Sequence, residues 1–215
     1  MKHLKPFLLS LCIILSLSGY SKTFPTPISI HVFPPLRLPI IDDVAGMRAS
    51  YVMGKSDTMY GLDAALIGNS TVKRFGGMAL SGGFNYNRGS TFINFFQLAG
   101  LVNYNKGEFS GYGLQFASLL NRNKGAGVFF GAQLSVLANI NDKGTIVGVG
   151  FASYNKVKNI VGVQAGFYNI ADRVFGVQLG LVNKAKNLHG IQIGLINFAA
   201  NGLIPAFPII NIGFW

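Results

Sequence analysis

Hydrophobic and polar positions alternate with a period of two along most of the chain after residue 22. In the stretch "GVQLGL" at 176–181, Val177 and Leu179 fall on one side, whereas Gln178 falls on the other between two glycines. This alternation is typical of a half-buried β-strand with one apolar face and one small, polar face. We therefore expect an all-β protein.

The alternating unit recurs along the chain, most clearly as "GVQLGLVN" followed by "GIQIGLIN" fourteen positions later. A repeat of this kind indicates that one local geometry is laid beside copies of itself. When the glutamine is taken as the marker, the equivalent positions are Arg48, Asp63, Ala79, Gln97, Gln115, Gln133, Gly150, Gln164, Gln178 and Gln192. An asparagine follows the marker five or six positions later at Asn69, Asn85, Asn103, Asn121, Asn139, Asn155, Asn169, Asn183 and Asn197.

Segments rich in Asn and Gly separate several of the units, among them "NYNRG" at 85–89 and "NRNKG" at 121–125. Because Asn and Gly accept the positive φ angles of tight turns, these segments predict hairpins. An opening strand in "PISIHVFPPL" and a closing strand in "AFPIINIGFW" bring the expected number of strands to twelve. An even number is what a bacterial transmembrane barrel requires.

Two architectures use one strand per short repeat: an up-and-down barrel, and a solenoid with parallel strands. The expected turns carry a net charge of +7 after the even-numbered strands and +1 after the odd-numbered strands. An alternation of this kind is expected if successive turns lie at opposite ends of a barrel. The sequence therefore predicts an antiparallel transmembrane β-barrel of about twelve strands, with a β-solenoid as the alternative.

The first residues have the three parts of a secretory signal: Lys2 and Lys5, an apolar run from Phe7 to Leu17, and small or polar residues after it. We expect a signal peptide over 1–21 and one repeat-built domain over 22–215, with a retained membrane anchor as the alternative. Cys12 is the only cysteine and lies in this signal, so the expected mature chain has no disulfide and no thiolate ligand.

In a barrel, the marker side chains would line the lumen, and the basic turns would contact lipid headgroups. The C-terminal aromatic residues Phe214 and Trp215 would serve as the assembly signal, so outer-membrane lipid and the barrel assembly machinery are the expected partners. The lumen or ladder residues are Gln97, Gln115, Gln133, Gln164, Gln178, Gln192, Arg48 and Asp63. The headgroup residues are Arg122, Lys124, Lys156, Lys158, Lys184 and Lys186.

Candidate chemistry is sparse. Paired carboxylates on one strand, a histidine cluster with metal spacing and a nucleophile elbow are all missing from the sequence, so no metal, no cofactor and no enzymatic activity are expected. A lipid-modifying role for His189 is a weaker possibility, because the sequence places no partner Ser beside it. The net charge of +11 does not indicate nucleic-acid binding, because the cations fall in expected turns of an exported protein.

The opening "ISIHVFPPLRLP", the runs "GVQAGFYN", "GVQLGLVN" and "GIQIGLIN", and the ending "NGLIPAFPIINIGFW" together resemble the bacterial surface-repeat family first named from leptospiral surface proteins. The resemblance covers nearly all of the expected mature chain and is strongest from Ile146 onward. It implies an exported, envelope-associated protein and supplies no catalytic residue.

These observations predict a non-enzymatic protein of the bacterial outer membrane or cell surface, with a structural role or a narrow channel. The alternative is a secreted β-solenoid that acts as an adhesin or binding module. The sequence does not identify a surface ligand.

Overall fold

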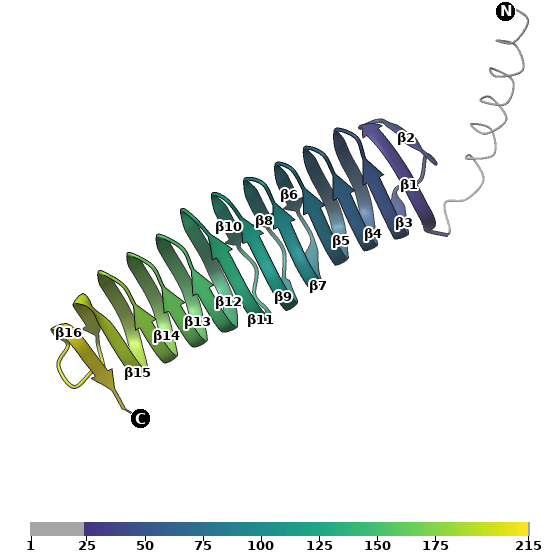
Figure 1. Ribbon diagram of the computed structural model, residues 1–215. Helices are drawn as coiled ribbons and strands as arrows, with labels where there is room; N and C mark the ends of the chain where they lie inside the picture. Colours follow the sequence, from purple (N-terminus) through teal and green to yellow (C-terminus); the bar gives the residue numbers. More distant parts are fainter. Residues whose placement is uncertain (1–23, 215) are drawn as a thin grey trace, which may run out of the picture.

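The computed structural model describes residues 24–214, which form a long stack of β-strands and contain no helix (Figure 1). The N-terminal part of the stack comprises β1 (Thr26–Phe33), β2 (Leu36–Leu38), β3 (Asp43–Ser50), β4 (Met53–Ala65), β5 (Gly68–Ser81), β6 (Phe84–Asn87), β7 (Ser90–Ala99) and β8 (Val102–Asn105). The C-terminal part comprises β9 (Phe109–Ala117), β10 (Leu120–Asn123), β11 (Val128–Ser135), β12 (Ala138–Phe151), β13 (Tyr154–Ala165), β14 (Tyr168–Leu179), β15 (Val182–Ala199) and β16 (Ala206–Gly213).

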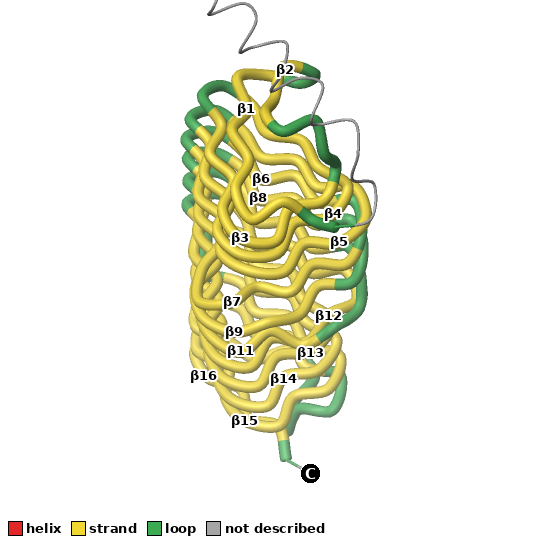
Figure 2. The backbone as a smooth tube through the Cα atoms, turned by 90° about the vertical axis from the view of Figure 1, so that its right-hand side faces the viewer, coloured by secondary structure: helices red, strands yellow, loops and turns green. Residues whose placement is uncertain are grey.

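Successive repeats form successive coils of a solenoid, which Figure 2 shows as rings stacked along one axis. Each coil contributes one segment to a sheet that carries the marker residues, called sheet 1, and one to a facing sheet that carries the asparagines, called sheet 2. In the longest coils the two segments are separate strands, as in β9 and β10, whereas β13, β14 and β15 each run through both sheets.

The predicted barrel is wrong, and the solenoid is the observed architecture. From β3 to β15 every pairing between neighbouring coils is parallel, whereas an up-and-down barrel requires antiparallel neighbours. Among the described residues, antiparallel pairs are found only between β1 and β2, between β15 and β16, and in an isolated bridge between Gly202 and Gly213. The lumen and the transmembrane strands were predicted only as parts of the barrel. Because the barrel is wrong, these two predictions are wrong as well.

The alignment of the repeats is confirmed. Gln164, Gln178 and Gln192 pair with one another in register on β13, β14 and β15, and Arg48 pairs in the same way with Asp63 at the N-terminal end. All ten marker positions form one column along sheet 1. The spacing of the repeat therefore gave the correct neighbours but not the direction of the strands.

The predicted hairpins are wrong for a local reason. Asn85 and Asn87 lie within β6, where their side chains point into the core instead of closing a turn. The same holds for Asn121 and Asn123 in β10. Asparagines two residues apart share one face of a strand, so this pattern marks a buried polar face here.

Part of the charge alternation that favoured a barrel is a consequence of stacking. Equivalent side chains on neighbouring coils lie about one strand spacing apart, ~4.8 Å, so opposite charges on successive coils attract and like charges repel. Lys186 Nζ lies 2.8 Å from Asp172 Oδ1 one coil away, and Lys73 Nζ lies 2.8 Å from Asp57 Oδ2. Stacking therefore accounts for the acidic residues that lie beside cations at these two places.

A column of glycines allows the coils to stack closely. The position two residues before the marker has a φ between +114° and +149° in nine coils, for example +138° at Gly176 and +141° at Gly190. A Cβ atom on Gly190 would lie 2.0 Å from the carbonyl oxygen of Gly176 in the preceding coil. In the tenth coil this position is Phe95, with a φ of +73°. Glycine fits here because it alone adopts this backbone at low cost and leaves room for the neighbouring carbonyl.

The core between the sheets has an apolar part and an amide part. The apolar part is a continuous cluster of Ile93, Phe109, Phe129, Ile146, Val157, Ile160, Ala171, Val174, Ala185, Leu188 and Ala199, preceded by a smaller cluster of Val44, Met59, Phe75 and Ala79. The amide part contains the buried marker glutamines and the asparagines of sheet 2. Both parts run along the axis, because each coil repeats the same inward positions.

The two ends of the stack differ from its middle. At the N-terminal end, β1 pairs in parallel with β3 and antiparallel with the short β2. At the C-terminal end, β16 pairs antiparallel with β15, and Asn211 lies opposite Gln192 (Figure 1). The expected opening and closing strands are therefore present, and each covers one end of the solenoid.

A pair of glycine substitutions in one coil tests the close stacking. Gly148 has a φ of +138°, and its Cβ would lie 2.1 Å from the Gly131 carbonyl oxygen, whereas the nearest atom to a Cβ on Gly150 is 3.7 Å away. We expect Gly148→Ala to lower the free energy of unfolding by roughly 2–3 kcal/mol and Gly150→Ala to change it by less than about 1 kcal/mol. Denaturant unfolding of both variants measures this; equal effects would contradict the proposed geometry.

Candidate functional site

A continuous asparagine ladder runs through the core. In each step the Nδ2 of one asparagine donates a hydrogen bond to the Oδ1 of the next, over distances between 2.8 and 3.1 Å. Its members are Asn69, Asn85, Asn103, Asn121, Asn139, Asn155, Asn169, Asn183 and Asn197. Most of them also donate to a main-chain carbonyl at the adjacent corner, as Asn169 does to Leu179 over 2.7 Å. The ladder therefore binds neighbouring coils together and fixes the corners.

The marker glutamines form a second ladder with the opposite direction. Gln192 Nε2 donates to Gln178 Oε1 and Gln178 Nε2 donates to Gln164 Oε1, each over 2.7 Å. In the longer coils the same bonds join Gln133, Gln115 and Gln97. The amide is suited to this role because it is both donor and acceptor. Gly150 interrupts the ladder between Gln133 and Gln164.

The longer coils contain additional amide pairs across the core. Gln115 and Asn123 exchange two hydrogen bonds of 3.2 and 3.0 Å, and Gln133 and Asn141 exchange two of 3.2 and 2.7 Å. In the fourteen-residue coils Val157 and Ala171 occupy the equivalent position of sheet 2. These side chains are buried, so the amides hold the coils together and are closed to a partner from solvent.

Arg48 and Asp63 form a buried ion pair where the glutamine column begins. Arg48 Nε donates to Asp63 Oδ1 over 2.7 Å, its Nη2 donates to Asp63 Oδ2, and its Nη1 donates to Ser56 Oγ over 2.8 Å. Burial raises the pKa of Asp63, and the charge and hydrogen bonds of Arg48 oppose this rise. The pair occupies the predicted ladder positions, but it stabilises the first coils instead of facing a lumen.

His31 lies beside this pair and is also buried. Its Nε2 is 2.8 Å from Ser29 Oγ, and its Nδ1 accepts a bond of 3.3 Å from the main-chain N–H of Lys55. An accepting Nδ1 places the ring proton on Nε2, which then donates to Ser29. Ser29 therefore has no general base in this arrangement. Burial and the charges of Arg48 and Arg37 lower the pKa of His31 to about 4, so the ring is neutral at pH 7.

The outer side of sheet 1 is an apolar face, which we define by the residues immediately before and after each marker. In β14, for example, these are Val177 and Leu179, on either side of the buried Gln178. The twenty positions contain only apolar residues. They are Met47, Ala49, Leu62, Ala64, Met78, Leu80, Phe96, Leu98, Leu114, Phe116, Ala132, Leu134, Val149, Phe151, Val163, Ala165, Val177, Leu179, Ile191 and Ile193.

The apolar face continues around one edge of the solenoid, where each coil turns from sheet 1 into sheet 2. We call this edge the apolar corner, and it exposes large side chains, including 64% of Leu66, 62% of Phe167 and 67% of Leu195. Its other large residues are Tyr51, Ile67, Leu101, Leu119, Val136, Leu137 and Leu181. The apolar surface is therefore L-shaped in cross-section.

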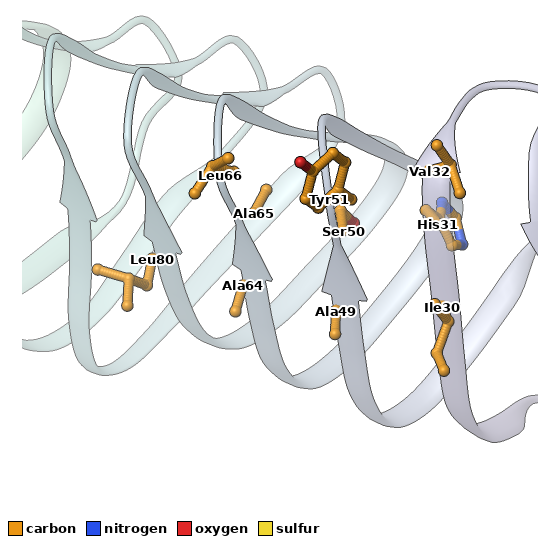
Figure 3. Close-up of a pocket in the computed structure, with 10 residues that line it drawn as sticks. All are labelled: Ile30, His31, Val32, Ala49, Ser50, Tyr51, Ala64, Ala65, Leu66 and Leu80. Atoms are coloured by element: carbon orange, nitrogen blue, oxygen red, sulfur yellow. The ribbon is translucent and has the colours of Figure 1, made fainter.

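Two apolar grooves lie along this corner. One has a volume of about 440 Å³ and forms because the small residues Ala49 and Ala64 lie in one row between the larger Ile30 and Leu80 (Figure 3). The other, of about 390 Å³, is lined by Phe151, Phe167 and Leu181 around glycines of the corner. Both are depressions in a surface that is already apolar.

The predicted headgroup residues gather on the opposite side of the molecule. Arg122, Lys156 and Lys184 lie in one column on the outer side of sheet 2, and Lys124, Lys158 and Lys186 follow each of them two residues later. Most of them lie within strands and not in hairpin turns. We call this side the basic face. It points away from the apolar face, and Lys184 lies three residues after Leu181 of the apolar corner.

The remaining predictions from the sequence have mixed outcomes. His189 stacks its ring on Phe175, with centroids 4.6 Å apart. Phe214 is exposed, whereas Trp215 and the predicted signal over 1–21 lie outside the described residues. Within 24–214, no three His, Cys, Asp or Glu side chains are grouped so that they could hold a metal ion. Over the same residues, no helix is long and apolar enough to cross a membrane.

Comparison with known proteins leaves the surfaces as the main guide to function. No protein-family model, no curated protein and no solved structure matches the chain. The ladder residues follow from the repeat in the sequence, whereas the continuous apolar face follows only from the parallel stacking of the coils.

The buried His31 predicts a pH-dependent stability. Its folded pKa of about 4 lies below the ordinary value of 6.5, so the unfolded chain takes up the proton first as the pH falls. The His31 contribution is therefore complete above pH 6.5 and is lost between pH 6.5 and 4, lowering the free energy of unfolding by roughly 2–3 kcal/mol.

Denaturant unfolding between pH 7 and 4 measures this effect. His31→Gln should remove this part of the pH dependence, whereas the control His189→Gln should retain it. Parallel pH profiles for the wild type and His31→Gln would show that His31 is not a buried neutral group.

Proposed function

We propose that this protein is a non-enzymatic, exported β-solenoid of a bacterial envelope, and that it binds lipid through its apolar face and apolar corner. The observation that carries the proposal is the unbroken column of apolar residues on either side of the markers in all ten coils. At about 4.8 Å per coil, the face is roughly 43 Å long.

Such a surface requires a partner. Met47, Leu80, Phe151 and Ile193 are 43–56% exposed, although side chains of this kind are usually found in cores. Contiguous apolar patches beyond a few hundred Å² mark interaction sites, and this one spans the whole stack. Coating it with an apolar partner removes that area from water, at roughly 25 cal/mol for each Å².

Two features favour lipid over a second copy of the chain. First, a face-to-face dimer of two flat sheets would cover the apolar face but leave Leu66, Phe167 and Leu195 of the corner in water. A lipid layer into which this edge inserts would cover both sides of the L. Second, the main chain of the stacked strands is hydrogen-bonded along the axis, so the inserted surface presents few unpaired polar groups to hydrocarbon.

The grooves of the apolar corner support the same partner. The two grooves have volumes of about 440 and 390 Å³, and most of the side chains that line them are apolar. A flexible acyl chain adapts to an apolar hollow, whereas a rigid protein surface fills it only where the two shapes match. The basic face remains in water on the far side, as in an amphipathic element that lies in an interface.

The location of the protein is part of the proposal. The signal-like opening and the resemblance to the leptospiral-type surface-repeat family support an exported protein at the outer membrane or the cell surface. The solenoid also supports the alternative considered from the sequence, that of a surface binding module or adhesin. The narrow channel and the barrel assembly machinery were expected of a barrel and are not proposed for a solenoid.

Vesicle binding with charge-bearing variants tests the proposal. We expect Phe151→Lys with Leu179→Lys to weaken sedimentation with phospholipid vesicles at least tenfold, because lysines at lipid-facing positions cost up to a few kcal/mol each, depending on depth. The matched control, Ile140→Lys with Ile170→Lys, places the same charges on the basic face and should retain binding.

The readout is the vesicle concentration that sediments half of the protein, measured for zwitterionic phosphatidylcholine so that charge attraction does not contribute. Equal binding by the two double variants would contradict the proposed orientation. A wild-type protein that stays in the supernatant at all vesicle concentrations would contradict lipid binding itself.

A further inference from the structure

The basic face has a repeat that the fold does not require. On five successive coils, one outward column of sheet 2 reads Arg122, Ile140, Lys156, Ile170 and Lys184. The column two residues further along reads Lys124, Asp142, Lys158, Asp172 and Lys186. Each coil with two cations is thus followed by a coil with an isoleucine and an aspartate. The period is two coils, or roughly 9.5 Å.

Ion pairing accounts for only part of this pattern. Asp142 lies 3.4 Å from Arg122, and Asp172 lies 2.8 Å from Lys186, so the aspartates lie between cations and reduce their repulsion. In the column that contains Ile140 and Ile170, Arg122 is paired with Asp142, whereas Lys156 and Lys184 form no ion pair with a described residue. A column with an isoleucine in every coil would be more stable than the observed one. It would contain no unpaired charge, and stacked β-branched residues pair well across strands.

Four of the six cations of the basic face are exposed, whereas Arg122 and Lys124 are half-buried. Lys156, Lys158 and Lys184 are exposed and form no ion pair with another described residue. Lys186 retains 72% exposure of its side chain even though it is paired. Over the five coils, six cations face two carboxylates, which leaves a net charge of +4. The face is therefore a regular row of three cation pairs with an excess of positive charge.

From this geometry we propose that the basic face binds a linear acidic polysaccharide along the solenoid axis. Each cation pair contacts one anionic group of the polymer, and Ile140 and Ile170 support the uncharged sugar between two anionic groups. The partner that fits carries one negative charge in each disaccharide, because its charges then recur at about the spacing of the cation pairs. The row accommodates three such charges.

A nucleic acid fits this row less well. Its phosphates recur about every 3.4 Å along one strand of a duplex, so most of them would fall between the cation pairs and beside Asp142 or Asp172. Charge density therefore distinguishes the two polyanions, although both are attracted to a basic surface. The proposal does not depend on lipid binding, because it uses the opposite face of the molecule.

The test compares variants that have the same composition and charge. Exchanging two residues, Ile170→Lys with Lys184→Ile, retains the net charge but destroys the two-coil period. The probe is a hyaluronan oligosaccharide, which has one carboxylate in each disaccharide, and binding is measured by calorimetry with the full protein in a neutral detergent that covers the apolar face. Circular dichroism and thermal unfolding show whether each variant retains the fold.

We expect the exchange variant to bind hyaluronan roughly tenfold more weakly than the wild type. Removing the cations outright, Lys156→Thr with Lys184→Thr, should weaken binding by at least as much, because two exposed charge contacts are lost. The control Lys143→Thr with Arg173→Thr removes the same charge from the opposite corner and should bind within about twofold of the wild type.

Three results would overturn the proposal: no binding of hyaluronan by the wild type, equal binding by the folded exchange variant, or tighter binding of duplex DNA than of hyaluronan at equal charge. Equal binding by the exchange variant would mean that the face responds to net charge and not to spacing. Preference for DNA would mean that the face is a nucleic-acid surface.

Discussion

The parallel, in-register stacking of coils is the constraint on which the rest of this structure depends. A residue in one coil lies about 4.8 Å from its equivalent in the next, so every inward position must tolerate a copy of itself. The amide side chains of Asn169 and Asn183 meet this condition by donating and accepting along the axis. The glycines before the markers meet it by leaving space for the carbonyl of the preceding coil, as between Gly176 and Gly190. Both requirements act in every coil, which explains why the repeat is so regular.

Stacking also turns single positions into surfaces. An apolar residue on either side of the marker becomes a face about 43 Å long when all coils contain one, and a lysine in every second coil becomes a row of charges. The apolar face and the basic face lie on opposite outer sides, because sheet 1 and sheet 2 share only their inner sides. A thin molecule with two unlike sides is suited to hold a lipid layer on one side and an aqueous polymer on the other, which are the two partners proposed.

The sequence predicted the neighbours in this fold but not the strand direction. Marker residues such as Gln164 and Gln178 are aligned correctly because the glycines and glutamines recur at the same offsets. A strand alternates with period two whether its neighbours are parallel or antiparallel, so the alternation around Val177 could not decide between a barrel and a solenoid. Asn85 and Asn87 indicated a turn because asparagine is common there, and only their burial beside Asn103 and Asn105 shows the ladder. The charge pattern of Asp172 and Lys186 reflects contact between neighbouring coils, which the sequence does not reveal.

The distance between the two ends of the apolar face tests the central claim most directly. Spin labels on Met47→Cys and Ile191→Cys, in a Cys12→Ala background, report this distance by pulsed electron resonance. A solenoid places the two positions nine coil spacings apart, so we expect a distance of about 43 Å between them. The length of the spin-label side chains is the only source of deviation from this value. A closed barrel would bring the first and last repeats near each other, only a few strand spacings apart. A mean distance of roughly 15–20 Å would therefore contradict the stacked architecture and, with it, both proposed surfaces.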